Sequence, residues 1–131
     1  MVIADQSSLP VAIHVASASP HEITLVEETI AQRFTRATPV RLVADKAYDS
    51  DPMDRKLTNI TELIAPHKAN RKRKKTQDGR SLRRMKRRWK VERLNAWLQN
   101  FRSITTRWAY RFENYRALVL LGCIMILFKH Y

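Results

Sequence analysis

Cysteine is almost absent from this sequence. Only one of the 131 residues, Cys123, is a cysteine. This excludes an internal disulfide and a metal site built from several cysteines, and it fits a reducing compartment. Because Cys123 lies within an apolar run, we expect it to be a small residue of the core.

Long apolar segments are also missing. The best candidate is the run of 12 residues from Ala117 to Phe128, between Arg116 and Lys129, whereas a membrane-spanning helix needs about 20. The run is apolar all round, so it predicts a buried helix and not a surface anchor. Met1 is not followed by the basic and apolar regions of a signal peptide. We therefore expect no membrane partner.

Acidic residues are scarce relative to basic ones. Twelve Asp and Glu stand against 25 Lys and Arg, which gives a formal net charge of +13. Residues 71–90 hold 12 of the basic residues and one acid, so this stretch contributes +11 and the remainder only +2. Such local charge is typical of a surface that binds a polyanion, and nucleic acid is the main candidate. The candidate DNA contacts are Arg71, Lys72, Arg73, Lys74, Lys75, Arg83, Arg84, Lys86, Arg87, Lys90 and Arg102.

The composition indicates one folded domain. Hydrophobic residues make up 44% of the chain, which is too many for a disordered basic tail. A chain of 131 residues supports a single domain with a modest core, here residues 1–131. Within it, residues 67–80 are polar, basic and contain Gly79, so we expect a flexible loop that orders on DNA.

The stretch from Arg83 to Arg102 predicts a helix, because it lacks Gly and Pro and is rich in good helix formers. One carboxylate falls on a stripe of apolar or small residues at helical spacing: Leu82, Met85, Trp89, Glu92 and Ala96. A carboxylate on an inward stripe is costly unless something pairs with it. A neighbouring Arg such as Arg88 or a bound divalent cation would stabilise Glu92. From the spacing alone, pairing of Glu92 with an arginine is slightly favoured over binding of a cation.

A second acid stands out at the end of a predicted strand. Val40–Ala44 is a short β-prone run, and Asp45 follows it directly. In an α/β sheet, ligands bind at the carboxyl ends of strands. Asp49 and Asp51 follow at once, and we interpret both as caps of the next helix, with Ser50 as another candidate cap.

The remaining chain alternates strands and helices. The N-terminal part predicts a hairpin of Met1–Ala4 and Leu9–Val15, with Asp5 in its turn. A helix follows from the capping box Ser19–Glu22 to about Arg36, and its inward residues are Ile23, Val26, Ile30 and Phe34. The later predicted elements are a helix at Asp51–Leu57, a strand at Ile60–Ala65 and a helix at Glu113–Tyr131. This order predicts an α/β fold that ends in helices.

Two motifs are similar to those of a known family. Residues 88–93 (Arg-Trp-Lys-Val-Glu-Arg) and 96–102 (Ala-Trp-Leu-Gln-Asn-Phe-Arg) closely resemble the C-terminal signature of bacterial insertion-sequence transposases of the DDE class. Residues 43–50 resemble the motif around the family's second acid. The family places its third acid on a helix four residues after an Arg, which is the spacing of Arg88 and Glu92. It also has a Tyr and a Lys where this chain has Met85 and Gln99.

The resemblance implies a fold and a set of site residues. The fold would be RNase H-like, with C-terminal helices. Asp45 would be the second catalytic acid and Glu92 the third, with Arg88 and Tyr48 in support. The predicted elements match this fold without its first, central strand, which in the family carries the first catalytic Asp. The chain therefore resembles the C-terminal part of a DDE catalytic domain.

The resemblance also implies chemistry and partners. Two Mg²⁺ or Mn²⁺ ions would assist two steps. In the first, water attacks a phosphodiester at an element end, and in the second, the released 3′-OH attacks target DNA. Asp45 would be a shared or flanking metal ligand and Glu92 the ligand of the second ion. The protein would be cytoplasmic and associated with the nucleoid. Without the first Asp, we expect little or no cleavage by this chain alone. An upstream-frame polypeptide or self-association would complete the site; otherwise the chain is a decayed remnant.

Two other functions compete with this interpretation. A non-catalytic DNA-binding fragment, such as a regulator that competes for element ends, explains residues 71–90 equally well. A basic structural protein explains the charge but neither Glu92 on its stripe nor Asp45 after its strand. The sequence does not specify the element, its terminal repeats, the target or the oligomeric state.

Overall fold

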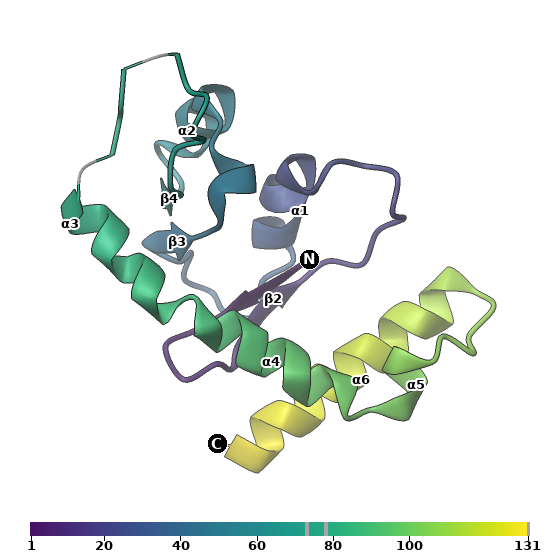
Figure 1. Cartoon of the computed structure of the whole chain (residues 1–131). Coiled ribbons are helices and arrows are strands. Elements are labelled where there is room, and N and C mark those ends of the chain that lie inside the picture. Colours follow the sequence, from purple (N-terminus) through teal and green to yellow (C-terminus); the bar gives the residue numbers. More distant parts are fainter. Residues whose placement is uncertain (73, 78, 131) are drawn as a thin grey trace.

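The computed structural model describes residues 1–72, 74–77 and 79–130 (Figure 1). The chain forms short strands, short helices and one long C-terminal helix. In chain order these are β1 (Val2–Ala4), β2 (Pro10–Ile13), η1 (Glu22–Leu25), α1 (Val26–Ala31), β3 (Arg41–Val43), η2 (Lys46–Tyr48), α2 (Asp51–Leu57), β4 (Glu62–Ile64), α3 (Gly79–Leu82), η3 (Arg83–Arg87), α4 (Trp89–Gln99), α5 (Arg102–Thr105) and α6 (Phe112–His130), where η marks a 3₁₀ helix. The predicted mixed α/β class is confirmed, while the RNase H-like topology stays a prediction.

The N-terminal hairpin forms as predicted. β1 and β2 pair antiparallel, with Ile3 opposite Ala12. The turn depends on Asp5, whose carboxylate Oδ1 accepts hydrogen bonds from the backbone N–H of Ser7 at 2.7 Å and of Leu9 at 2.8 Å. Such a bond pattern is the normal turn chemistry of aspartate. Asp5 is therefore a structural residue.

The second pair of strands is parallel. Leu42 of β3 lies opposite Leu63 of β4, and α2 makes the crossover between the two strands. Parallel strands need such a connection. The two strand pairs form separate sheets of two strands each.

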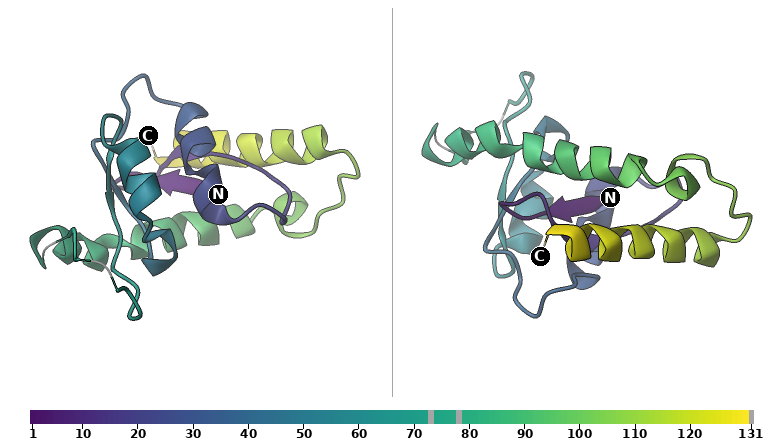
Figure 2. Two further views of the ribbon diagram at one scale, coloured as in Figure 1. Left: turned by 90° about the horizontal axis from the view of Figure 1, so that it is seen from above. Right: turned by 90° about the horizontal axis from the view of Figure 1, so that it is seen from below.

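Helices cover the strands on two sides (Figures 1 and 2). α1 and α2 pack on one side, where Val26, Ile30 and Leu57 join Ile3 of β1 in one core cluster. α4 and α6 pack on the other side, and their buried residues join Ile13 of β2 in a second cluster: Leu94, Leu98, Val119, Cys123 and Ile126. Both faces of the hairpin are therefore buried.

The first helical segment is shorter than predicted. Val26 and Ile30 are buried as expected, but the segment ends at Ala31 and not near Arg36. No side chain caps η1, so the predicted capping box of Ser19 and Glu22 does not form. Phe34 does not face the core; its backbone N–H donates to Val11 O of β2 at 2.8 Å. This bond holds Phe34 at the outer edge of β2, because the carbonyl groups of an edge strand need hydrogen-bond donors.

The predicted stripe on the Glu92 helix is wrong. Within α4 the buried residues are Leu94 and Leu98, while Trp89, Glu92 and Ala96 are exposed. The physical reason is that Leu94 and Leu98, four residues apart, form a more apolar face of the same helix, and this face packs against Ile13 of β2. The 3₁₀ segment η3 also separates Met85 from α4, so residues 79–99 are not one continuous helix.

The C-terminal helix is only partly buried. Val119, Gly122, Cys123 and Ile126 face the core, and burial raises the pKa of the Cys123 thiol to about 11. The opposite face carries exposed apolar side chains: Leu121, Ile124, Met125 and Phe128. In the described part of the chain, no helix combines the length and apolar character needed to span a membrane.

Candidate active site

Asp45 lies where the sequence places it, directly after β3. It is the N-cap of η2, and its carboxylate Oδ1 accepts a hydrogen bond from Ala47 N at 2.8 Å. Its other oxygen, Oδ2, lies 3.8 Å from Nη1 of Arg88. The Asp45 side chain is 44% exposed. One carboxylate oxygen thus fixes the turn and the other remains accessible.

Glu92 lies in the first turn of α4 and is bound to the same arginine. Nη2 of Arg88 donates to Oε1 of Glu92 at 2.8 Å, and the Glu92 side chain is 57% exposed. The arginine that the sequence offers as a partner therefore pairs with Glu92. Its guanidinium joins Asp45 and Glu92, which are distant in sequence.

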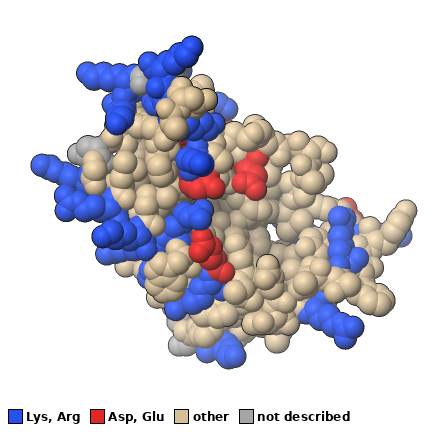
Figure 3. All heavy atoms as spheres, in the orientation of Figure 1, with Lys and Arg blue, Asp and Glu red and all other residues tan. Residues whose placement is uncertain are grey.

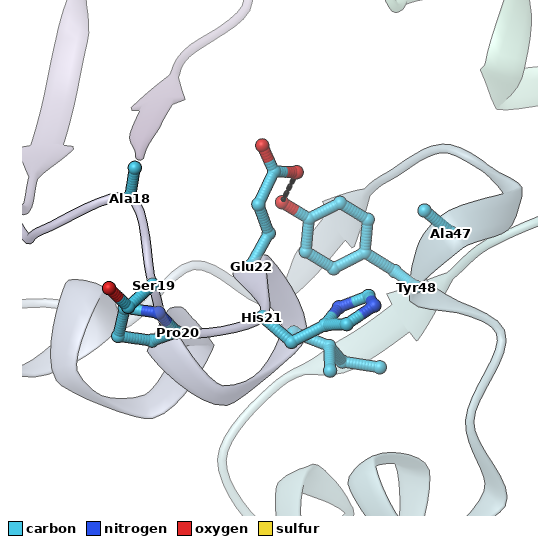
Figure 4. Close-up of a pocket in the computed structure, with 8 residues that line it drawn as sticks. Ala18, Ser19, Pro20, His21, Glu22, Ala47 and Tyr48 are labelled. Atoms are coloured by element: carbon cyan, nitrogen blue, oxygen red, sulfur yellow. Dashed lines mark hydrogen bonds between the residues drawn. The ribbon is translucent and has the colours of Figure 1, made fainter.

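Tyr48 connects this site to a further acid. Its hydroxyl donates to Oε2 of Glu22 at 3.1 Å (Figure 4). Burial, and after it the charge of Glu22, raises the pKa of Tyr48 above its usual range. The pair lies at a pocket of about 350 Å³ lined by Ala18, Ser19, Pro20, His21, Glu22, Ile23, Ala47 and Tyr48. From the sequence, Glu22 was expected only to complete a capping box, and the structure instead places its carboxylate on the Tyr48 hydroxyl.

A larger groove adjoins these residues. Its volume is about 1520 Å³, and its lining includes Glu22, Asp45, Tyr48 and Arg88. Figure 3 shows acidic side chains gathered around a hollow in the middle of this face, with basic side chains between and beside them. Asp45, Glu92 and Arg88 therefore form a charged group that is open to solvent.

Asp49 does not act as a helix cap. Its side chain is only 4% exposed, and its carboxylate accepts hydrogen bonds from His67 Nδ1, Arg71 Nη1 and Lys68 N, each at 2.8 Å. The N-cap of α2 is Ser50, without a side-chain cap bond. A buried carboxylate is costly without hydrogen-bond donors, and here the donors all come from the basic segment of residues 67–80.

The two side chains that bond to Asp49, those of Arg71 and His67, make further bonds. Arg71 Nη2 also pairs with Asp51 Oδ1 at 2.5 Å, and the Arg71 side chain is 11% exposed. Asp51 is therefore bound to this arginine, where the sequence predicted a cap. His67 Nε2 accepts from Thr76 N at 3.1 Å, which places the proton on Nδ1, the atom that donates to Asp49.

Neutralising Asp49 should destabilise the fold in a pH-dependent way. Burial raises the pKa of Asp49, but the hydrogen bonds from Lys68 and His67 and the charge of Arg71 outweigh it and lower the pKa below its usual value. The charged form therefore stabilises the fold above the unfolded-state pKa, and this contribution is lost as the pH falls through the native pKa. Asp49→Asn should cost about 3 kcal/mol at pH 7.

Urea unfolding at pH 7 and at lower pH measures this effect. The difference in unfolding free energy between the wild type and Asp49→Asn should shrink as the pH falls. The partly buried Asp54 offers a comparison, because its carboxylate makes no salt bridge to Arg71 among the described residues and burial raises its pKa, so Asp54→Asn should not cost stability at pH 7. An Asp49→Asn protein as stable as the wild type at pH 7 would contradict the role given to this cluster.

The predicted DNA-contact residues fall into three groups. Exposed residues of the 67–80 segment and of η3 and α5 are Lys72, Lys74, Lys75, Arg83, Lys86, Arg87 and Arg102. Arg84 is half-buried, and Lys90 donates from Nζ to the backbone O of Gln6. Arg71 is held by the two aspartates, and Arg73 lies outside the described residues. Bonds at His67, Arg71 and Gln77 tie the segment to the fold, and its flexibility stays a prediction.

The donor chemistry of the site fits a hard divalent cation in part. Asp45 and Glu92 offer carboxylate oxygens, which are the ligands that Mg²⁺ and Mn²⁺ prefer. In the described residues, no group of three or more His, Cys, Asp or Glu side chains is arranged to hold a metal ion. Asp45 and Glu92 by themselves are fewer than such a group requires.

Comparison with known proteins identifies the family of this chain. Residues 1–128 match the family model described as "Transposase DDE domain", so the chain is a member of this family. It is also 30% identical, over 135 residues, to a protein of Burkholderia cepacia named as transposase for insertion sequence element IS402. The alignment covers 95% of this chain and 60% of that relative, so the chain spans about three-fifths of the relative's length. No solved structure matches.

Proposed function

We propose that this chain supplies two acids of a transposase active site that cleaves DNA at an element end and joins the released 3′-OH to target DNA. The observation that carries the proposal is the single guanidinium of Arg88, which joins Asp45 after β3 to Glu92 on α4. These are the residues at the second and third acid positions of the family motifs. The family match over residues 1–128 supports the reaction class.

Asp45 and Glu92 are the proposed metal ligands. A divalent cation bound there would activate the attacking oxygen and stabilise the leaving one. Asp45 keeps Oδ1 on Ala47 N, which holds its carboxylate in one orientation, and both side chains are about half exposed. Arg88 balances the two negative charges and would turn to a DNA phosphate once a cation takes its place.

Tyr48 is a positioning residue in this proposal. Its hydroxyl binds Glu22, and its backbone N–H donates to the Asp45 carbonyl at 3.1 Å. These bonds connect the turn that carries Asp45 to the start of η1. Tyr48 therefore holds that turn beside the groove.

The exposed basic residues would bind the DNA backbone. Arg83, Lys86 and Arg87 of η3 immediately precede Arg88, so phosphates bound to η3 would lie close to the two acids. Contacts to phosphate fix position and carry no sequence information by themselves. Recognition of the sequence at an element end therefore requires residues other than these phosphate contacts.

Cleavage by the chain alone and by a completed protein tests the proposal. A chimera in which this chain replaces the matching region of the Burkholderia cepacia relative supplies the other 40% of that relative (100 − 60). We expect Mg²⁺-dependent nicking of DNA that carries the element ends by the chimera and little or none by the 131-residue chain. Appreciable Mg²⁺-dependent nicking by the chain alone would contradict the expectation that the site is incomplete. Salt-sensitive DNA binding by a chimera that never nicks would favour the alternative of a DNA-binding regulator.

A further inference from the structure

The loop between α5 and α6 exposes two aromatic side chains. Trp108 is 79% exposed and Tyr110 is 99% exposed. Residues 106–111 all lie in the described part of the chain, and they form neither a helix nor a strand. An aromatic side chain buries about 150–250 Å² when it packs, so leaving two of them in water gives up a large stabilisation. The fold therefore leaves both ring surfaces available to a ligand.

The same loop is rich in arginine. Residues 102–116 contain four arginines against the single acid Glu113, so this segment carries a formal charge of +3 (4 − 1). All four arginines are exposed, and they are Arg102, Arg107, Arg111 and Arg116. A surface with positive charge and open ring faces is complementary to a ligand with negative charge and flat faces. Nucleic acid combines these two properties.

Arg107 and its neighbours place the loop at the edge of the large groove. The guanidinium carbon of Arg107 lies 5.3 Å from the ring centroid of Tyr115, which is within the range of a cation–π contact. The hydroxyl of Tyr115 donates to the backbone O of Ile104 at 3.3 Å. Tyr115 and Ile104 both line the groove of about 1520 Å³ that also contains Asp45 and Arg88. The loop is therefore continuous with the groove of the proposed active site.

The loop and the basic segment η3 lie at opposite ends of α4. In Figures 1 and 2, α3, which precedes η3, stands at one end of α4, and α5 stands at the other. The 11 residues of α4 span about 16 Å, which equals about five nucleotides of a duplex strand. The groove lining includes Arg84 and Arg87 of η3 and also Leu98 and Gln99 at the far end of α4. A DNA strand that follows the groove from η3 therefore reaches the α5–α6 loop.

We propose that the α5–α6 loop binds unpaired bases of a DNA strand, which stack on Trp108 and Tyr110, while Arg107 and Arg111 contact the adjacent phosphates. In an intact duplex the neighbouring bases cover each base face, so aromatic side chains stack on single-stranded nucleotides. The Cα atoms of Trp108 and Tyr110 lie at most about 7 Å apart, because two residues separate them at full extension. The two rings can therefore contact neighbouring bases of one strand.

This proposal rests on the proposed function only for the source of the unpaired strand. Cleavage at an element end leaves a strand that ends in a 3′-OH, and the bases next to a nick can separate from their complement. Two other occupants fit the loop less well. A second copy of the chain carries the same net charge of +13 and would oppose arginine with arginine. An acidic protein would pair with the arginines but would leave the two ring faces without flat partners.

Binding of single-stranded DNA by the 131-residue chain tests the proposal. The probes are a labelled oligothymidine of about 15 nucleotides and a labelled duplex of the same length, both followed by fluorescence anisotropy. Trp108→Ala and Tyr110→Ala should each weaken binding of the single strand by at least about fivefold, since each removes one stacked base. Both variants should bind the duplex within about twofold of the wild type, which also shows that they are folded.

Matched variants separate stacking from other effects. Phe128 is an exposed aromatic residue of α6 outside this loop, so Phe128→Ala should leave both affinities unchanged. Trp108→Phe should keep most of the single-strand affinity, because it keeps a ring that can stack. Trp108→Ala should not change the slope of log K against log salt for the single strand, whereas Arg111→Ala should reduce its magnitude by about 0.7, the value for one phosphate contact.

Two results would overturn the proposal. The first is a Trp108→Ala protein that loses equal affinity for the single strand and the duplex, or loses none. The second is a dimer of the wild type in sedimentation that Trp108→Ala abolishes, since a second copy would then occupy the loop. Because none of these measurements involves DNA cleavage, failure here is distinguishable from failure of the proposed function.

Discussion

Glu92→Gln should abolish strand cleavage by the chimera and leave DNA binding unchanged. The substitution keeps the size of the side chain and a hydrogen bond acceptor for Arg88, but it removes the negative charge that a divalent cation requires. Glu92 is half exposed and outside the core, so the fold should not suffer. We expect Mg²⁺-dependent cleavage to fall by about 10³-fold or more, since the metal supplies most of the charge stabilisation in such reactions.

A matched substitution separates the site from a general loss of negative charge. Glu113 is exposed in the first turn of α6, as Glu92 is in the first turn of α4. Glu113→Gln should leave cleavage within about twofold of the wild type. Cleavage by Glu92→Gln that stays within tenfold of the wild type would mean that Glu92 pairs with Arg88 for structural reasons only.

Binding of this chain to duplex DNA should weaken steeply with salt. If five of the exposed basic residues of the 67–80 segment, η3 and α5 contact phosphates, the slope of log K against log salt is about −4.5. The association constant would then fall by about 500-fold between 50 and 200 mM salt. Fluorescence anisotropy with a labelled duplex measures the slope.

Single substitutions should distinguish phosphate contacts from structural residues. Arg83→Ala and Lys86→Ala should each reduce the magnitude of the slope by about 1, since each removes one phosphate contact. Lys129→Ala changes an exposed lysine in the last turn of α6 and should leave the slope unchanged. Arg71→Ala should instead lower stability, because Arg71 pairs with Asp49 and Asp51. A slope near −1 for the wild type would contradict a DNA-binding surface of this extent.

Features defined by neighbours in the sequence were predictable. The Asp5 turn, the strand before Asp45 and the pairing of Arg88 with Glu92 all join residues within a few positions of one another. Turn chemistry and helical spacing act at this range. The position of Asp45 after β3 and the partner of Glu92 therefore followed from the sequence.

The orientation of α4 was not predicted, although its signal is present. Val91, Leu94, Leu98 and Phe101 also follow helical spacing and are more apolar than the stripe chosen through Glu92. The 3₁₀ segment η3 breaks the phase between the two halves of the run, and no residue marks that break. Glu92 therefore faces solvent, where a group that acts on an external substrate is better placed than inside the core.

The role of Asp49 depended on distant residues. Its partners His67 and Arg71 lie about 20 positions further along the chain, inside the basic segment. The local sequence offered only the capping interpretation, since a cap and a buried ion pair both use aspartate before a helix.

Metal rescue of a Glu92→Cys chimera shows whether Glu92 is a metal ligand. A thiolate is a poor ligand for Mg²⁺, which requires oxygen, and a better one for transition metals such as Mn²⁺. We expect Glu92→Cys to cleave DNA at less than about one-hundredth of the wild-type rate with Mg²⁺ and to recover at least about tenfold with Mn²⁺, while Glu92→Gln recovers with neither. Equal Mg²⁺ and Mn²⁺ rates for Glu92→Cys, or full activity with Mg²⁺, would contradict this expectation.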